Sequence, residues 1–347
     1  MFLMLSTLLA CGEKFDFGDT IPRDDAFETL APEADELARY EAAFAYSAEH
    51  GGRSMLVLRD NQVVFDQAHE GHDTDVANHI FSGTKSFSCA LAMALELDLD
   101  HALSADLPEM ASGDKADITL RHVLDFTSGL EQDAWAFSWR LQQEPDDQKV
   151  ADHYQHAIEQ ESQWTPGTAY EYGGVHQGAF GAWLQAVHGS PLTLMDTHLF
   201  EPLGMKYAGW AHDSQGQIAL GQGAWMTAWE WAKFGVLAKD DGVWKGNQVL
   251  PAGSFEQCWT GSQAMPAYGL TWWLNEPVTD AQYEDLPPPI DEYPPAALLG
   301  DTADVVAAAG HEDNRLFVVP SLDLVAVRMG DGSGEWSDPD FLALLLP

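Results

Sequence analysis

The sequence predicts a mixed α/β (α+β) fold, in which a mainly antiparallel sheet flanked by helices is joined to a helical subdomain. Two hairpin patterns support this prediction, one near each end of the chain. A mostly helical middle separates them, so the two ends would supply one sheet and the helical region would be inserted between them. The four strand candidates are residues 54–59, 62–67, 315–319 and 324–328.

Each predicted element has a local signal. Asp60-Asn61 joins the first strand pair, and Pro320 to Asp323 joins the second. Apolar residues at helical spacing mark the helices, and an early helix around Tyr40 ends near Gly51-Gly52. Another helix begins at Ser82. The remaining helix candidates are residues 118–126, 152–161, 178–187, 226–238 and a closing segment at 341–346.

The predicted domain organisation follows the same pattern. Residues 37–80 and 240–347 form the sheet subdomain, residues 81–239 form the helical subdomain, and together they make one catalytic unit. The preceding segment, residues 12–36, is acidic and contains two prolines, which is typical of a tether.

Composition limits the partners of the chain. Its 347 residues are 46% apolar and include 13 tryptophans, so the chain can bury a substantial core. The net charge of −39 makes nucleic acids and anionic lipid headgroups poor partners, because they are also negative. We interpret this charge as an adaptation to solubility or high salt. The expected partner is a small-molecule substrate.

The first residues resemble a bacterial lipoprotein signal. A short apolar run ends in Leu8-Leu9-Ala10 before Cys11, although no basic residue precedes Lys14. The run is too short to span a bilayer but is typical of a secretory signal. The resemblance implies that residues 1–11 are the signal and that Cys11 is lipidated. The protein would then be exported, in the periplasm or anchored to the outer membrane, with no membrane contact except through this lipid.

Cysteine and histidine patterns predict no cofactor or metal. With three cysteines the chain has no disulfide scaffold and no cysteine-based zinc module. Pairing of Cys89 with Cys258 stays open, and two buried thiols are the default expectation. His153 and His156 lie one turn apart, but no accompanying carboxylate–histidine signature makes a metal site, so a solvated helix face is favoured.

The most informative motif is Ser82-Gly83-Thr84-Lys85, at the start of an apolar helical pattern. Residues three apart share a helix face, so an amine would lie beside a hydroxyl. Backbone N–H groups at a helix N-terminus favour developing negative charge. A serine with an adjacent amine in a desolvated site is a candidate nucleophile. The alternative is a capping serine followed by a solvated lysine.

A second S-x-x-K sequence runs from Ser112 to Lys115. It lies among Gly, Asp and Ala, and no apolar periodicity follows it. We therefore interpret this copy as a surface turn.

From about residue 55 to the end, the chain resembles the serine β-lactamase and penicillin-binding-protein superfamily, especially its class C-related esterase branch that includes 6-aminohexanoate-dimer hydrolases. The resemblance implies a β-lactamase/transpeptidase-like fold. Six landmarks in the expected order carry it. They are Phe81 to Phe87, Ile118 to Leu130, Pro166 to Gly173, Glu201 to Met205, Tyr268 to Trp273, and Ala309-Gly310 with the hairpin from Val318 to Val325.

The resemblance also implies roles for individual residues. Ser82 would be the nucleophile of an acyl-enzyme, and Lys85 its proton-transfer partner. Tyr172 would act as general base or acid, with Tyr170 as its rival two residues away. Whether Lys85 or Tyr172 is the kinetic base stays open. The oxyanion hole would be formed by the backbone N–H groups of Ser82 and His311.

The His311 assignment follows from Gly310, which matches the glycine of the third motif. Two positions depart from the family pattern. Gly174 replaces an asparagine, and His176 two residues later is either near the site or structural. Ala308 replaces the usual lysine or histidine, which removes a charge-assisted contact to a substrate carboxylate.

The function predicted from these residues is a serine acyl hydrolase, an esterase or amidase for small neutral substrates. The first alternative is a β-lactamase or D-amino-acid peptidase. The second is a non-catalytic binding or sensory protein with the same fold, which the departures at Gly174 and Ala308 motivate.

Overall fold

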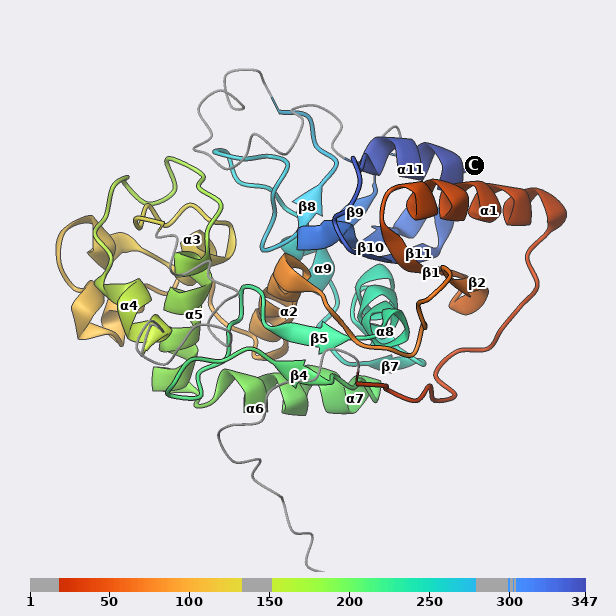
Figure 1. Cartoon of the computed structure of the whole chain (residues 1–347). Coiled ribbons are helices and arrows are strands. Elements are labelled where there is room, and N and C mark those ends of the chain that lie inside the picture. Colours follow the sequence, from red (N-terminus) through yellow and green to blue (C-terminus); the bar gives the residue numbers. More distant parts are fainter. Residues whose placement is uncertain (1–18, 133–151, 279–298, 300–301, 303) are drawn as a thin grey trace, which may run out of the picture.

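The structure is a computed structural model that describes residues 19–132, 152–278, 299, 302 and 304–347. Its centre is a six-stranded antiparallel sheet with the order β2-β1-β11-β10-β9-β8. The first strands of the chain thus lie beside the last ones, which confirms the predicted fold class (Figure 1). The strands are β1 (Gly52–Arg59), β2 (Gln62–Ala68), β8 (Trp273–Leu274), β9 (Val306–Gly310), β10 (Asn314–Val319) and β11 (Leu324–Gly330).

Both predicted hairpins are present. Asp60 and Asn61, which join β1 to β2, have φ values of 51° and 60°, and Asp323 before β11 has a φ of 53°. Asp and Asn tolerate this left-handed backbone better than other non-glycine residues, which explains why they occupy the turns. Pairing of Val57 with Ala326 and of Phe317 with Ala326 then joins the two hairpins through β11.

The two faces of the sheet are covered by different helices. Along β11, Val325 and Val327 pack in one core, whereas Leu324 and Ala326 pack in the other, as strand alternation requires. Helix α8 (Ala228–Lys239) lies on the first face. Helices α1 (Ala34–Glu49) and α11 (Asp338–Leu345) pack together on the second face (Figure 1).

The remaining helices lie mainly beside the sheet (Figure 1). Several were predicted with shifted bounds: α5, for example, begins at Gly174 and not at residue 178. The others were not predicted because they are short. The elements are η1 (Phe81–Lys85), α2 (Ser86–Ala94), η2 (Leu103–Ala105), η3 (Pro108–Met110), η4 (Gly113–Asp117), α3 (Leu120–Leu124), α4 (His153–Glu159), α5 (Gly174–Val187), α6 (Pro191–Met195), the π-helix η6 (Asp196–Phe200), α7 (Glu201–Leu203), α9 (Ser254–Cys258), η8 (His311–Asp313) and η9 (Pro320–Leu322).

Two small sheets complete the fold. Strands β3 (Asn78–His79), β5 (Ala224–Met226) and β4 (Gly209–Trp210) form one of them, and β6 (Val243–Trp244) with β7 (Asn247–Gln248) forms the other. Strand β3 leads directly to Ile80 and η1, so β5 helps to place the first motif.

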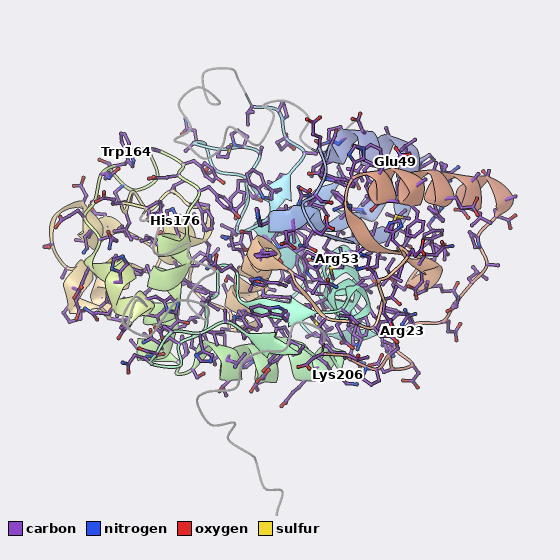
Figure 2. All side chains as sticks on the ribbon, in the orientation of Figure 1. Arg23, Glu49, Arg53, Trp164, His176 and Lys206 are labelled. Atoms are coloured by element: carbon purple, nitrogen blue, oxygen red, sulfur yellow. A yellow bond between two sulfur atoms is a disulfide. The ribbon has the colours of Figure 1, made fainter. Side chains whose placement is uncertain are left out.

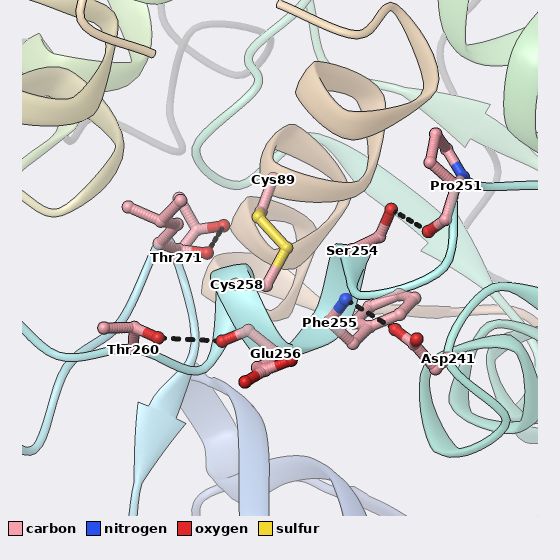
Figure 3. Close-up of a disulfide and its surroundings, with 10 residues drawn as sticks. Cys89, Asp241, Pro251, Ser254, Phe255, Glu256, Cys258, Thr260 and Thr271 are labelled. Atoms are coloured by element: carbon pink, nitrogen blue, oxygen red, sulfur yellow. Dashed lines mark hydrogen bonds between the residues drawn. A yellow bond between two sulfur atoms is a disulfide. The ribbon is translucent and has the colours of Figure 1, made fainter.

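A disulfide joins Cys89 on α2 to Cys258 on α9 (Figure 3). The default expectation of two buried free thiols is therefore wrong. The cysteines are 169 residues apart, and only the packing of α2 against α9 brings their Cα atoms to 5.9 Å. The bridge fixes the helix that follows the first motif.

Part of the expected tether is packed on the body of the protein. Thr20 forms an isolated bridge with Val76, and Ile21 is buried. Asp24 accepts a hydrogen bond from the buried Lys233 at 2.7 Å. The predicted signal, residues 1–11 with Cys11, and residues 12–18 lie outside the described residues. Within the part of the chain that the structure describes, no helix has the length and apolarity needed to cross a bilayer.

Candidate active site

The first motif lies on η1, a 3-10 helix, directly before α2. A 3-10 helix has three residues per turn, so side chains three apart stand one above the other. Lys85 Nζ lies 3.0 Å from Ser82 Oγ. Ser82 is partly exposed whereas Lys85 is only 2% exposed, so the hydroxyl faces a place that substrate can reach and the amine is shielded behind it.

Gly83 explains how this motif packs so closely. A Cβ atom at Gly83 would lie 2.5 Å from Cζ2 of Trp231 on α8, closer than real side chains approach. The next residue, Thr84, accepts a hydrogen bond from the Ala224 N–H at 3.1 Å. Helix α8 and strand β5 therefore hold η1 in place from two sides.

Burial changes the chemistry of Lys85. Its Nζ also donates to the Gly221 carbonyl at 2.6 Å. Desolvation disfavours the charged form and lowers the pKa of Lys85 from 10.5 to about 7. Near neutral pH a large share of this amine is therefore unprotonated and able to accept a proton from Ser82.

Tyr172 lies beside Lys85. The Lys85 Nζ is 4.9 Å from the centre of the Tyr172 ring, a distance at which a cation attracts an aromatic ring. The ring of Tyr172 packs among Phe126, Tyr268 and Trp273 at centroid distances of 5.4, 6.0 and 5.7 Å. The structure thus brings three residues of the predicted site, Ser82, Lys85 and Tyr172, into one cluster.

The rival Tyr170 lies deeper in the protein. It is 3% exposed and packs against Phe126 and Tyr268 in the core under α1 and α11. Tyr172 is partly exposed at the edge of the same core. This difference favours Tyr172 as the residue at the reaction centre.

His176 on α5 is buried (Figure 2), and its ring stacks on that of Phe126 at a centroid distance of 4.7 Å. Its Nε2 lies 2.8 Å from the Glu171 carbonyl, which can only accept, so Nε2 carries the proton. Its Nδ1, at 2.9 Å, then accepts from Ser128. Burial lowers the pKa of His176 to about 3, so the ring is neutral. Its bonds fix the backbone directly before Tyr172, which is a supporting role.

The third motif meets the first one at the end of β9. A Cβ at Gly310 would lie 2.1 Å from the Ile80 carbonyl oxygen and 3.3 Å from the Gly83 nitrogen. Only a glycine permits this approach. His311 follows at once, and its ring meets that of Phe81 edge-on at 5.3 Å. The structure therefore brings the peptide between Gly310 and His311 beside the segment that carries Ser82.

Ala308, which stands where the family pattern has a lysine or histidine, supplies no charged group to the candidate site. It is 2% exposed and packs in the core beneath α8. A pocket of about 250 Å³ lies between the end of β9 and the start of α11, and it is lined by Ala307 and Ala309, on the other face of β9 from Ala308. Its lining includes His311, Trp273 and Trp336, together with the carboxylates of Glu312 and Asp313.

Some contacts of the site carried no sequence signal. The Gly221 carbonyl is 136 residues from Lys85, and no local pattern marks a backbone oxygen as a functional group. Arg315 donates to the Gly310 carbonyl, but the sequence pattern around it predicts only a strand. The available signal was an arginine inside an otherwise apolar predicted hairpin, because charged residues are seldom fully buried unless they are paired.

The described residues include no group of three or more His, Cys, Asp or Glu placed to hold a metal ion. The expectation of a solvated helix face at His153 is wrong, because this residue is buried and its Nδ1 lies 2.8 Å from Asp213. This pair anchors the start of α4.

Comparisons with known proteins agree with this architecture. A family model described as beta-lactamase matches residues 37–334. A structure assigned as a 6-aminohexanoate-dimer hydrolase from Bacillus anthracis has a TM-score of 0.70 and 15% identity, covering 94% of this chain and 85% of that chain. A penicillin-binding protein homologue from Caulobacter crescentus gives 0.64 and 16%, covering 91% and 97%.

A family VIII carboxylesterase gives a TM-score of 0.64 and 15% identity, covering 91% of this chain and 97% of that chain. Such low identities show that the fold is shared and leave the substrate open. A search of curated proteins finds no significant match.

Proposed function

This chain belongs to the beta-lactamase family, and we propose that it is a serine hydrolase that cleaves small neutral esters or amides through an acyl-enzyme on Ser82. The observation that carries the proposal is the 3.0 Å contact between Ser82 Oγ and the buried amine of Lys85. A non-catalytic binding protein has no need to bury an amine against a reachable hydroxyl, since burial disfavours the charged form of the amine.

In the first step, Ser82 Oγ attacks the substrate carbonyl carbon and forms a new C–O bond. Its proton passes to the pair formed by Lys85 and Tyr172. The carbonyl oxygen gains negative charge, which the N–H groups of Ser82 and His311 stabilise in our proposal. The bond to the leaving group then breaks, and the leaving alcohol or amine takes up the proton.

In the second step, water attacks the Ser82 ester. The same pair accepts a proton from this water, and the carbonyl oxygen is again stabilised in the oxyanion hole. The ester bond breaks, the carboxylic acid leaves, and the proton returns to Ser82 Oγ. The products are the acid and the alcohol or amine, and the enzyme is restored.

The surroundings of His311 support neutral substrates. Ala308 supplies no cation for a substrate carboxylate, and the adjacent pocket contains Glu312, Asp313 and Asp338. The arginine of this pocket, Arg315, is already bonded to Asp338. A negatively charged substrate group that extended past His311 into this pocket would therefore lie close to these carboxylates. This disfavours anionic β-lactams, which leaves the β-lactamase and D-amino-acid peptidase alternatives as outcomes of the test.

The test is hydrolysis of p-nitrophenyl butyrate by the full chain and by Ser82→Ala, with the intact mass measured after a fluorophosphonate probe. We expect turnover and one covalent adduct in the wild-type protein and neither in Ser82→Ala. Ser112→Ala is the matched control and should behave as wild type. Turnover that survives in Ser82→Ala would remove Ser82 as the nucleophile, and efficient hydrolysis of a chromogenic cephalosporin would favour the β-lactamase alternative.

We also propose that the chain is exported and anchored through Cys11. The disulfide between Cys89 and Cys258 supports export, because such bonds persist mainly in oxidising compartments. Intact mass of the protein isolated from membranes should show a lipidated Cys11, and a soluble cytoplasmic chain that keeps residues 1–11 would contradict this proposal.

A further inference from the structure

Arg315 on β10 is a buried arginine, 5% exposed, that pairs in register with Ala309 on β9. Its Nε lies 2.9 and 3.0 Å from the two carboxylate oxygens of Asp338, in the first turn of α11. Its Nη1 donates to the Gly310 carbonyl at 2.8 Å and to the Asn314 carbonyl at 3.1 Å. The guanidinium is therefore clamped on one side and bonded to the third motif on the other.

The Gly310 carbonyl and the His311 N–H belong to one peptide group. The described residues contain no cis peptide bond, and in a trans peptide the C=O and the N–H point in opposite directions. A donor that holds the carbonyl therefore also fixes the direction of the N–H. A charged donor further polarises the peptide, which makes its N–H a stronger hydrogen-bond donor.

The position of this peptide in the sheet indicates the direction of the His311 N–H. One edge of β9 pairs with β10, where Arg315 lies. On the other edge, β8 pairs only with Val306 and Ala307, so among the described strands none covers that edge at Gly310. The segment that carries Ser82 also packs on this peptide, because a Cβ at Gly310 would lie 2.1 Å from the Ile80 carbonyl oxygen and 3.3 Å from the Gly83 nitrogen. Because the Gly310 carbonyl accepts from Arg315, the His311 N–H points away from Arg315, to the opposite side of the peptide.

We propose that Arg315 is a positioning residue for the oxyanion hole: it holds and polarises the peptide between Gly310 and His311, and Asp338 holds Arg315. This inference rests on the proposed function and extends it. Through Asp338 the last helix, α11, is linked to the reaction centre, although none of its residues contacts Ser82 in the proposed chemistry.

The test compares Arg315→Met with Lys233→Met. Lys233 is a matched control because it is also a buried cation bonded to a carbonyl, that of Gly204, and to carboxylates, those of Asp24 and Glu230. Both variants should lower the melting temperature. Activity is expressed per site that reacts with a fluorophosphonate, so that loss of folded protein does not count as loss of rate.

We expect Arg315→Met to lower kcat for p-nitrophenyl butyrate by about 10–100-fold, with KM within about twofold of wild type. This is less than the loss of a whole oxyanion donor, because the N–H itself remains. The affinity for phenylboronic acid should fall by the same factor, since its tetrahedral adduct with serine places an oxygen in the hole. Lys233→Met should leave both quantities within about twofold.

A merely structural arginine would change the melting temperature and leave kcat per reactive site and boronate affinity unchanged, and that result would overturn the proposal. If Arg315→Met does not fold, Asp338→Asn loosens the same clamp and should lower kcat and boronate affinity together by a smaller factor. If the wild-type protein shows no turnover, the proposed function fails and this inference with it. If it is active and Arg315→Met equals it, only the role of Arg315 fails.

Discussion

The chain contains the same four-residue pattern twice, at Ser82–Lys85 and at Ser112–Lys115, and the two copies have different surroundings. Both lie at or within short 3-10 helices, η1 and η4. In the first copy the amine contacts the serine and is 2% exposed. In the second copy the serine is exposed, and Lys115 Nζ donates to the Ile158 carbonyl at 2.6 Å.

The contrast shows that the pattern alone does not make a nucleophile. The backbone differs between the two copies, because Ser82 lies inside η1, whereas Ser112 is the extended residue before η4 and the following Gly113 has a φ of 60°. The packing differs as well: α8, β5 and the end of β9 surround the first copy, whereas a Cβ at Gly113 would have no atom of the described residues within 4 Å. Desolvation lowers the pKa of Lys85 to about 7, which fits the role of proton acceptor proposed for this amine.

The largest expected difference between the two copies is in the rate of hydrolysis after each amine is removed in turn. Lys85→Met should lower kcat/KM for p-nitrophenyl butyrate by about 100–10,000-fold, because the proton acceptor of Ser82 is lost. Lys115→Met should leave the rate within about twofold, since its amine only bonds a carbonyl near the surface. Equal rates for the two variants would refute the assignment of Lys85.

The glycine that follows each serine tests whether close packing around the motif affects stability and activity. Gly83→Ala should destabilise the fold by about 1–3 kcal/mol, because the new Cβ would overlap Trp231, and should also lower activity by moving Ser82.

Gly113→Ala meets no atom within 4 Å but has a φ of 60°, so about 1–2 kcal/mol of backbone strain and unchanged activity per folded molecule are expected. Thermal unfolding and active-site titration of both variants measure the difference. A Gly83→Ala enzyme with wild-type activity would show that the contact with Trp231 does not position the motif.

The last expected difference between the two copies is in the pH dependence of the rate. Because the pKa of Lys85 is about 7, kcat/KM should rise about tenfold per pH unit below 7 and level off above it. This limb should be absent in Lys85→Met and unchanged in Lys115→Met.

The same shift has a consequence for stability. The pKa of Lys85 is about 7 in the folded protein and 10.5 in its ordinary state, so the folded chain binds fewer protons between these values. The contribution of this group to the free energy of unfolding therefore rises with pH from about 7 to 10.5 and is least favourable below 7.

For the pH dependence of the rate, a kcat/KM that stays constant between pH 5 and 8 would contradict the role of Lys85 as base.

Elements with a strong local signal were predicted well. The turns at Asp60-Asn61 and at Asp323 fix their hairpins within a few residues, and strand alternation follows from the apolar pattern. Short elements such as β8 and α9, and the 3-10 form of η1, were not predicted, because two to five residues carry too little periodicity to define them. The disulfide also required the fold, since spacing does not specify pairing.

In the candidate site, too, some features were predicted from the sequence and others depend on the fold. The relation of Ser82 to Lys85 follows from helical spacing, and Tyr172, Gly310 and His311 came from the resemblance to a family. Their meeting at one place is a property of the fold: it depends on β9 passing against η1 and on the Tyr172 segment lying beside Lys85. His176 could not be assigned from sequence, because its contact with Ser128, 48 residues away, is a tertiary contact.

By itself the sequence determined the hairpins, the helical spacing of a serine and an amine, and the order of the family landmarks, because each of these depends on neighbours along the chain. Only the tertiary structure decided which of two equal motifs is buried, where the Gly221 carbonyl and Arg315 meet the site, and which cysteines pair. The physical reason is that desolvation and hydrogen bonding act through space, and the atoms that supply them here come from residues far apart in the chain.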